Sequence, residues 1–265
     1  MKKEVRFGPV GIGKLTEIEH TFKIYSELGF TAVEIPFTYG VYIKKDQHKE
    51  EIQLIKKLSK KLGISLSIHA PYWINLNSLE KEKIEASKKR ILDSCEIANL
   101  IGAKRVVFHS GFYGKGDREG AYQNIKKRIQ EMLNTIKKKK WDVLLCPETM
   151  GKINVFGSLD EISRLKDETG CSFCIDFSHN LARYKEYKFE LVREKFTEKS
   201  WHCHFSGIEY GEKGEKKHKR TSREELSTLF KHLPKDKDIN IISESPDPAE
   251  DSVLALKIWK KFEHK

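Results

Sequence analysis

The segment SIHAPYWINL, residues 67–76, has the composition of a buried strand that ends in a histidine. His69 follows the apolar start of this segment, and two large aromatic residues, Tyr72 and Trp73, come shortly after it. A single histidine at a strand end is more often a hydrogen-bonded core residue than a metal ligand. The function of His69 therefore depends on which residues end the other strands.

Eight short apolar runs alternate with longer polar segments of helical periodicity along the 265 residues. We expect strands in the apolar runs, which are 5–11, 32–37, 66–71, 105–111, 143–149, 173–179, 202–207 and 239–246. Eight strand–helix repeats with right-handed connections indicate a closed parallel barrel. We therefore predict the α/β class and a single (β/α)8 TIM barrel, with residues 1–265 as one domain. An open doubly wound sheet is the alternative, but GPVGIG at 8–13 matches its G-x-G-x-x-G turn poorly.

The composition limits the kinds of partner. Lys and Arg exceed Asp and Glu by 11, which favours polyanions and above all nucleic acid, although simple solubility is an alternative. No apolar run is long enough for a transmembrane helix, and the N-terminus lacks a signal peptide, so we expect no membrane association. The odd number of cysteines predicts reduced thiols in the cytoplasm, and we expect a monomer.

Six consecutive strands end with side chains that can bind a metal. These side chains are His69, His109, Glu148, Asp176, His179, His204 and Glu244. Carboxylates brought together at one barrel mouth repel each other unless a cation lies between them. Imidazoles mixed with carboxylates suit zinc, manganese, iron or cobalt, and the set is too large for one tetrahedral ion. We therefore predict two or three ions with Glu148 as a bridge, which would suit water activation and in-line displacement at phosphorus.

Several motifs resemble the endonuclease IV family of apurinic/apyrimidinic endonucleases, which belongs to the xylose-isomerase-like barrels. The motifs are HAPYWINL (69–76), GAKRVVFHSG (102–111), PETMGK (147–152), IDFSHN (175–180), HFSG (204–207) and SESP (243–246). The resemblance covers roughly residues 5–250. It implies hydrolysis of the phosphodiester 5′ to an abasic site in double-stranded DNA.

The resemblance also implies roles for individual residues. The implied metal ligands are His69, His109, Glu148, Asp176, His179, His204, His218 and Glu244. Zinc is the expected metal, with Mn²⁺ or another divalent ion as an alternative, and Glu148 is the expected catalytic bridge. Tyr72 and Trp73 match positions that enter the DNA minor groove beside the lesion, where apolar wedges kink a duplex.

Three features depart from the family pattern. Lys216 stands where an Asp two residues before His218 is expected, and Glu215 could replace that Asp only if the loop is remodelled. Ser178 replaces a usual cysteine, and the loop after the second strand has no clear arginine. A weak or absent third ion is therefore one expectation.

Other residues admit two interpretations. The basic side chains of segment 208–220 suit contact with the DNA backbone or are simply solvated, and they are Lys213, Lys216, Lys217, Lys219 and Arg220. His202 is expected to lie one layer deeper than His204. Glu34 lies where sugar isomerases of this superfamily often place a polar residue, or it pairs with a lysine or arginine of the barrel.

Two other functions remain open from the sequence. In a sugar isomerase or epimerase of the same superfamily, a single ion would be held by Glu148, Asp176, His204 and Glu244. Glu148 and Glu244 would then move protons on the substrate carbon. A DNA-damage binder with impaired catalysis is the third possibility.

Overall fold

Eight parallel strands form the centre of the protein, whose computed structural model describes residues 3–262. The strands are β1 (Val5–Pro9), β2 (Ala32–Pro36), β3 (Ser65–His69), β4 (Arg105–Phe108), β5 (Leu144–Pro147), β6 (Ile175–Asp176), β7 (Ser200–Phe205) and β10 (Asp238–Ser243). They pair in two sheets, β1-β10-β7-β6 and β2-β3-β4-β5. Parallel bridges from Val10 to Glu34 and from Glu148 to Cys174 join the sheets, which closes the barrel.

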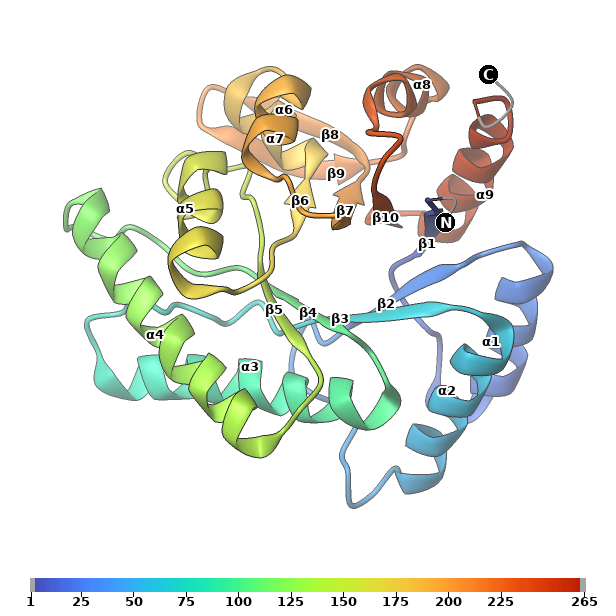
Figure 1. The fold of residues 1–265 in the computed structure, drawn as a ribbon, viewed down its shortest axis with the longest axis horizontal. Helices are drawn as coiled ribbons and strands as arrows, with labels where there is room; N and C mark the ends of the chain where they lie inside the picture. Colours follow the sequence, from blue (N-terminus) through green and yellow to red (C-terminus); the bar gives the residue numbers. More distant parts are fainter. Residues whose placement is uncertain (1–2, 263–265) are drawn as a thin grey trace.

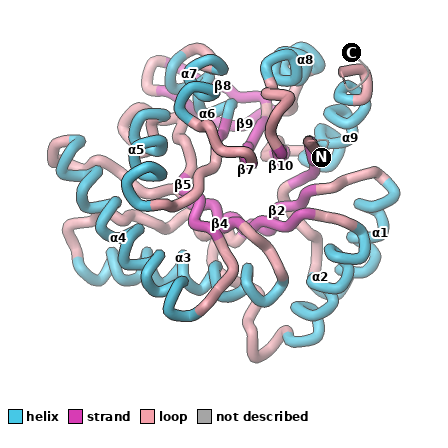
Figure 2. The backbone as a smooth tube through the Cα atoms, viewed as in Figure 1, coloured by secondary structure: helices cyan, strands magenta, loops and turns pink. Residues whose placement is uncertain are grey.

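Helices surround the strands on the outside, as Figures 1 and 2 show. They are η1 (Leu15–Glu17), α1 (Ile18–Glu27), α2 (Lys49–Leu62), α3 (Lys81–Ile101), α4 (Arg118–Lys139), α5 (Leu159–Thr169), α6 (Phe177–Tyr184), α7 (Phe189–Lys195), α8 (Arg223–His232) and α9 (Pro248–Trp259). Because helices cover the outer face and side chains fill the interior, the strands are buried on both faces. This explains their near-continuous apolar sequences.

Local signals in the sequence set several helix ends. Ser158 and Ser222 begin α5 and α8 with complete capping boxes, in which Glu161 and Glu225 return the hydrogen bond. Helix α2 ends at Gly63, whose φ of 68° is readily adopted by glycine. These ends fix where each chain segment turns back into the barrel.

Two segments differ from the sequence-based expectation. Strand β6 is only two residues long, because Asp176 caps a helix that begins at Phe177. His179 therefore lies in the first turn of α6, and not on a strand. The expected loop after the seventh barrel strand is an antiparallel hairpin, formed by β8 (Gly207–Gly211) and β9 (Gly214–Lys219).

Candidate metal centre

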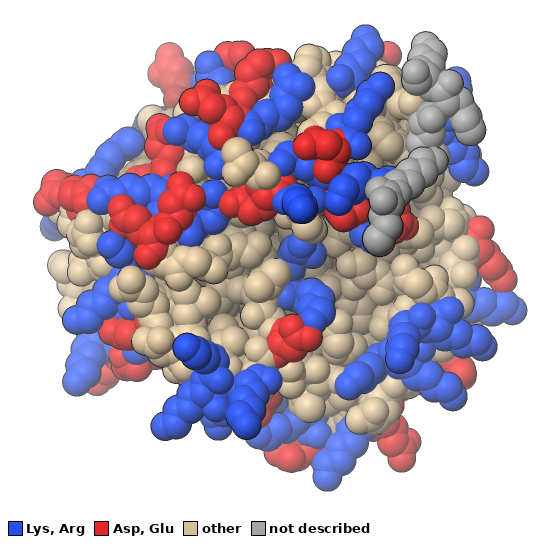
Figure 3. Space-filling model, in the orientation of Figure 1, with Lys and Arg blue, Asp and Glu red and all other residues tan. Residues whose placement is uncertain are grey.

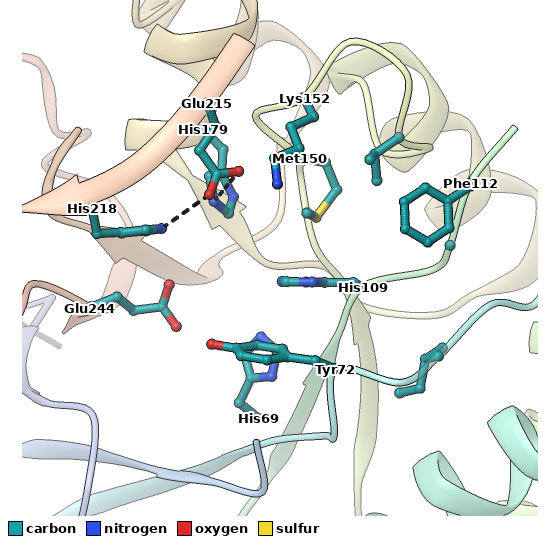
Figure 4. A pocket seen from close by; sticks show the side chains of 13 residues that line it. His69, Tyr72, His109, Phe112, Met150, Lys152, His179, Glu215, His218 and Glu244 are labelled. Atoms are coloured by element: carbon teal, nitrogen blue, oxygen red, sulfur yellow. Dashed lines mark ion pairs between the residues drawn. The ribbon is translucent and has the colours of Figure 1, made fainter. Parts of the chain in front are cut away.

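Polar side chains gather at one end of the barrel, where the carboxyl ends of the strands meet. They lie at or next to the ends of β3, β4, β5, β6, β7 and β10, and they are His69, His109, Glu148, Asp176, His204 and Glu244. The ends of parallel strands in a closed barrel face the same side, so their side chains converge there. Figure 4 shows the imidazoles and carboxylates around a common space.

Glu148 is the hub of this cluster and is fully buried. Its Oε2 lies 3.2 Å from Nε2 of His69 and 3.2 Å from Nε2 of His109. Its Oε1 lies 3.1 Å from Nδ1 of His179 and 3.4 Å from Nδ1 of His204. Each oxygen of one carboxylate therefore faces two imidazoles, which is the central position that a bridging ligand needs.

Three buried atoms near the hub have no hydrogen-bond partner among the described residues. They are Oε1 of Glu148, Oδ2 of Asp176 and Nδ1 of His204. Potential ligand atoms of these three residues and Glu244 all lie within 4.8 Å of one another. Buried polar atoms are costly when unpaired, and a divalent cation would satisfy all of them. We call Glu148, Asp176, His204 and Glu244 the inner group.

Two further groups extend the cluster on either side of the hub. His69 and His109 form one group with Glu148, and His179 and His218 form another with Asp176. Because Glu148 and Asp176 are each shared between groups, the arrangement has donors for two or three ions. The mixture of imidazole and carboxylate donors suits zinc or a similar transition metal.

The β8–β9 hairpin contains a bulge that the sequence does not reveal. Glu209 pairs with Lys217 and Tyr210 pairs with Glu215, so Lys216 has no partner on the opposite strand. An extra residue in one strand shifts the alternation of side chains that follows it. The bulge therefore turns Glu215 to the same face of the hairpin as His218.

Glu215 consequently points into the site, as Figure 4 shows. Its Oε2 lies 3.5 Å from Nε2 of His179, and its Oε1 lies 3.9 Å from Nε2 of His218. A side chain at Gly151 would collide with the Cβ of Glu215, so the glycine makes room for this approach. The remodelling that would let Glu215 replace the missing aspartate is present, and Lys216 is exposed outside it.

Electrostatic coupling in the cluster is strong. Burial would raise the pKa of Glu148, but the positive charges of His109 and His204 hold it well below its usual range. Burial also opposes ionisation of Glu244, whose pKa His204 lowers to about 2. Burial alone would lower the pKa of His69, but its hydrogen bond to Glu148 raises it to about 9. Protons on the imidazoles thus balance the carboxylates, and a bound divalent cation would displace them.

Aromatic and basic residues surround the opening above the hub. A cavity of about 330 Å³ lies between the imidazoles and this rim. Tyr72 stacks on His109 with ring centroids 5.5 Å apart, and 53% of its surface is exposed. Trp73 is 66% exposed and Phe112 50%. Lys152 ends the motif PETMGK, and no sequence signal indicates a role for it. It extends its ammonium group into the cavity (Figure 4).

The basic residues of the hairpin are not equivalent. Lys213 and Lys216 have no ion pair with any described residue, whereas Lys217 pairs with Glu209 and Lys219 lies 3.7 Å from Glu225. Arg220 differs most from the expectation of a free DNA-contacting side chain.

Arg220 contacts three carboxylates near the start of α9. The carboxylates belong to Asp247 at 3.4 Å, Glu250 at 2.7 Å and Asp251 at 3.3 Å. Its positive charge is therefore neutralised by carboxylates of the protein itself. Arg220 links the end of the hairpin to the start of α9.

Of the two interpretations of Glu34, pairing with a lysine or arginine is not what the structure has, because its partners are histidines. It is fully buried inside the barrel and faces His202 and His204, at 2.9 Å each. His202 lies one layer below His204, as predicted. No signal within the segment AVEIPF indicated these partners, because they come from a strand 168 positions away.

A family model described as the xylose isomerase-like TIM barrel matches residues 22–260. The chain belongs to the xylose isomerase-like TIM barrel family. The predicted (β/α)8 fold is confirmed, and so is the resemblance to this superfamily. None of the helices in residues 3–262 has both the length and the apolar character needed to cross a bilayer.

Relatives of the chain include an uncharacterized protein and several proteins named probable endonuclease 4. An uncharacterized protein of Methanocaldococcus jannaschii is 36% identical over 99% of this chain and 100% of its own length. A probable endonuclease 4 of Mycobacterium leprae is 31% identical, but the match covers 45% of this chain and 47% of that protein. The chain thus aligns with less than half of the endonuclease relative.

Solved structures with the same fold belong to enzymes of different names. Endonuclease IV from Thermus thermophilus has a TM-score of 0.72 at 19% identity, with 98% of this chain and 99% of that chain covered. The 3-keto-D-glucoside 4-epimerase from E. coli also has a TM-score of 0.72, at 14% identity, with 97% and 100% covered. Because these identities are low, the two structures bear on the fold alone, and the function must be argued from the site.

Proposed function

We propose that the protein is a divalent-metal-dependent phosphodiesterase that incises double-stranded DNA on the 5′ side of abasic sites. We further propose that it acts in the cytoplasm as a single-domain monomer, with zinc as the metal. The resemblance of its motifs to endonuclease IV and the partial match to probable endonuclease 4 support this assignment.

One observation carries the proposal, namely that imidazoles approach both oxygens of Glu148. Four imidazoles lie within 3.4 Å of this carboxylate, and they come from His69, His109, His179 and His204. A single-ion isomerase site would need only the inner group. The additional donors on both sides of the hub are what a cluster of two or three ions would require.

When bound, such ions supply acidity that makes water a nucleophile at neutral pH and charge that stabilises displacement at phosphorus. The proposed ligands are His69, His109, Glu148, Asp176, His179, His204, His218 and Glu244. We add Glu215, because its carboxylate lies 3.5 Å from His179. Glu148 stays ionised because its pKa lies well below neutrality, which suits a shared ligand.

The rim residues would hold the DNA over this cluster. The ammonium group of Lys152 lies in the cavity, where it can contact a phosphate oxygen. Tyr72 and Trp73 present exposed rings beside the cavity and can insert against bases at a kinked step. Basic and acidic side chains mix over the face in Figure 3, which shows no single broad basic patch there. On the hairpin itself, Lys217 and Lys219 already lie near Glu209 and Glu225, so its lysines would contact DNA individually.

Incision of a defined duplex tests the proposal. The zinc-loaded protein should cut DNA that carries a stable abasic analogue and leave a 3′-hydroxyl. Glu148→Gln should abolish incision while the thermal unfolding curve still shows a folded barrel, because the shared carboxylate is lost. Glu50→Gln, an exposed change on α2, is the matched control and should cut normally. Normal incision by Glu148→Gln would contradict the assignment.

A sugar epimerase remains the second candidate, because the inner group alone offers four ligands for a single ion. In that case Glu148 and Glu244 would exchange a substrate proton. Solvent deuterium incorporation into ketoses, without any incision of abasic DNA, would favour it. Tight binding of abasic DNA by the metal-loaded protein without incision would instead favour a damage binder.

A further inference from the structure

Glu34 lies in the middle of β2, directly below the metal centre and fully buried. Its Oε2 accepts hydrogen bonds from Oγ of Ser67 at 2.7 Å and from Nε2 of His202 at 2.9 Å. Its Oε1 lies 2.9 Å from Nε2 of His204. Because a buried carboxylate is costly to keep without partners, these contacts indicate a specific role.

His204 connects Glu34 to the inner group through its two ring nitrogens. Its Nδ1 faces the opposite way, 3.4 Å from Oε1 of Glu148 and 3.4 Å from Oε1 of Glu244. A neutral imidazole carries one N–H and one lone pair. If Nε2 donates its proton to Glu34, the lone pair of Nδ1 is directed at the inner group.

The thiol of Cys174 also lies close to His204, so the contact between His204 and Glu34 has to be judged on its own geometry. Neither Nε2 of His204 nor Oε1 of Glu34 makes a hydrogen bond of standard geometry among the described residues, either to each other or to a third group. Their 2.9 Å approach is therefore a close charge contact, and the tautomer proposed below would turn it into an N–H donated to the carboxylate. Ser67 and His202 hold the second oxygen of Glu34, so the carboxylate cannot turn away without losing two hydrogen bonds.

Two other imidazoles of the centre have neutral groups behind them. The outer nitrogen of His69 lies 2.8 Å from the carbonyl oxygen of Ala70, and Nδ1 of His218 lies 2.6 Å from the hydroxyl of Ser206. Both partners are neutral, whereas the partner of His204 is a carboxylate. A carboxylate behind a metal-binding histidine fixes its tautomer and makes it a stronger ligand.

We propose that Glu34 is a positioning residue that fixes the tautomer of His204 and strengthens the binding of a divalent ion by the inner group. The proposal rests on the proposed function only in requiring that the centre binds divalent ions, and it does not require incision. Glu34 does not contact the reacting atoms, so it acts through His204.

The same residues offer a second arrangement of donors. Cys174, His202 and His204 have potential ligand atoms within 4.8 Å of one another. An ion bound there would compete with Glu34 for these two imidazoles and would have the Cys174 thiolate as a ligand. The test below separates this arrangement from the proposed one.

Titration with Co²⁺, followed by its visible absorption, measures the effect of Glu34. Glu34→Gln keeps the shape and removes the charge, so the affinity for one ion should fall about 10- to 100-fold while the other ions bind as before. Asn240→Ser, which removes a buried side chain in the barrel that contacts Ser65 and not Glu34, is the matched control and should bind Co²⁺ like wild type. Equal Co²⁺ affinity for Glu34→Gln and wild type would overturn the proposal.

Nuclear magnetic resonance of the wild-type protein tests the tautomer without any buried substitution. In ¹⁵N-labelled, zinc-loaded protein, His204 should carry its proton on Nε2 and coordinate through Nδ1. A His204 protonated on Nδ1, a sulfur-to-cobalt absorption band from Cys174, or a wild-type chain that takes up no divalent ion would each overturn the proposal. A metal-loaded protein that passes these tests but does not cut DNA would contradict only the nuclease assignment.

Discussion

On one side of Glu148, His69 and His109 extend from the ends of β3 and β4, whereas on the other side His218 and Glu215 extend from the β8–β9 hairpin. The first pair sits on strands that are hydrogen-bonded to neighbours in the barrel. The second pair sits on an isolated two-stranded sheet with a bulge, and such a ribbon needs packing against other elements for stability. The barrel side is therefore fixed by the fold, and the hairpin side depends on its contacts with α6.

The largest effect is expected when one histidine is substituted on each side of Glu148 and the incision rates are compared. His69→Gln should lower incision of abasic DNA more than about 100-fold, since it removes a direct neighbour of Glu148, and His218→Gln only about 10-fold. Initial rates at saturating zinc measure both. His20→Gln, an exposed change on α1, is the control for a lost imidazole. Equal losses for His69 and His218 would mean that the two sides contribute alike.

The pH dependence of the free energy of unfolding, measured on the metal-free protein, tests the contacts on the barrel side. Contact with Glu148 raises the pKa of His69 to about 9, so its contribution to stability is fully present below the unfolded value near 6.5 and is lost as the pH rises through 9. With a chelator present, His69 alone should lower the free energy of unfolding by about 3 kcal/mol between pH 6.5 and 9. Urea unfolding measures this, and the fall should be smaller in His69→Gln. An identical pH profile in the variant would exclude His69 as a source.

The barrel side was also the part that the sequence could predict. Each of its proposed ligands directly ends or follows a run of apolar residues, so strand periodicity alone placed His69, His109 and Glu148 at the same end of the barrel. The eight strand–helix repeats likewise determined the fold. Local patterns were sufficient there because parallel barrel strands have one regular geometry.

The hairpin and the barrel interior were less predictable, for different physical reasons. Segment 208–220 has no apolar run, and a bulge arises from the pairing of two strands and not from the composition of either. Glu34 and His204 meet only because β2 and β7 face each other across the closed barrel. Both features depend on contacts between distant segments, which a single sequence does not specify.

Deletion of the bulge tests whether Glu215 belongs to the hairpin side of the centre. Without Lys216, β8 and β9 would pair regularly and Glu215 would stand two residues before His218, still on the same face. The deletion variant should therefore retain its zinc content. Glu215→Gln, in contrast, should lower the affinity for one zinc ion about 10-fold.

Lys216→Asp is the matched test of the alternative alignment. It restores the family's aspartate in sequence, but on the bulge residue, which is exposed outside the site. We expect the zinc affinity of Glu215→Gln to be unchanged when Lys216→Asp is added. Recovery of the lost zinc ion in this double variant would show that position 216, and not 215, faces the centre.

The smallest effect is expected at Arg220, where the hairpin contacts the barrel. Its charge is balanced by Asp247, Glu250 and Asp251, so Arg220→Ala should leave the salt dependence of DNA binding unchanged and lower stability by less than about 1 kcal/mol. Lys213, which has no ion pair among residues 3–262, is the comparison on the same hairpin. Lys213→Ala should reduce the slope of log affinity against log salt by about one, as for a lost phosphate contact. A reduced slope for Arg220→Ala would mean that DNA draws this arginine away from its three carboxylates, and the hairpin would then have to move when DNA binds.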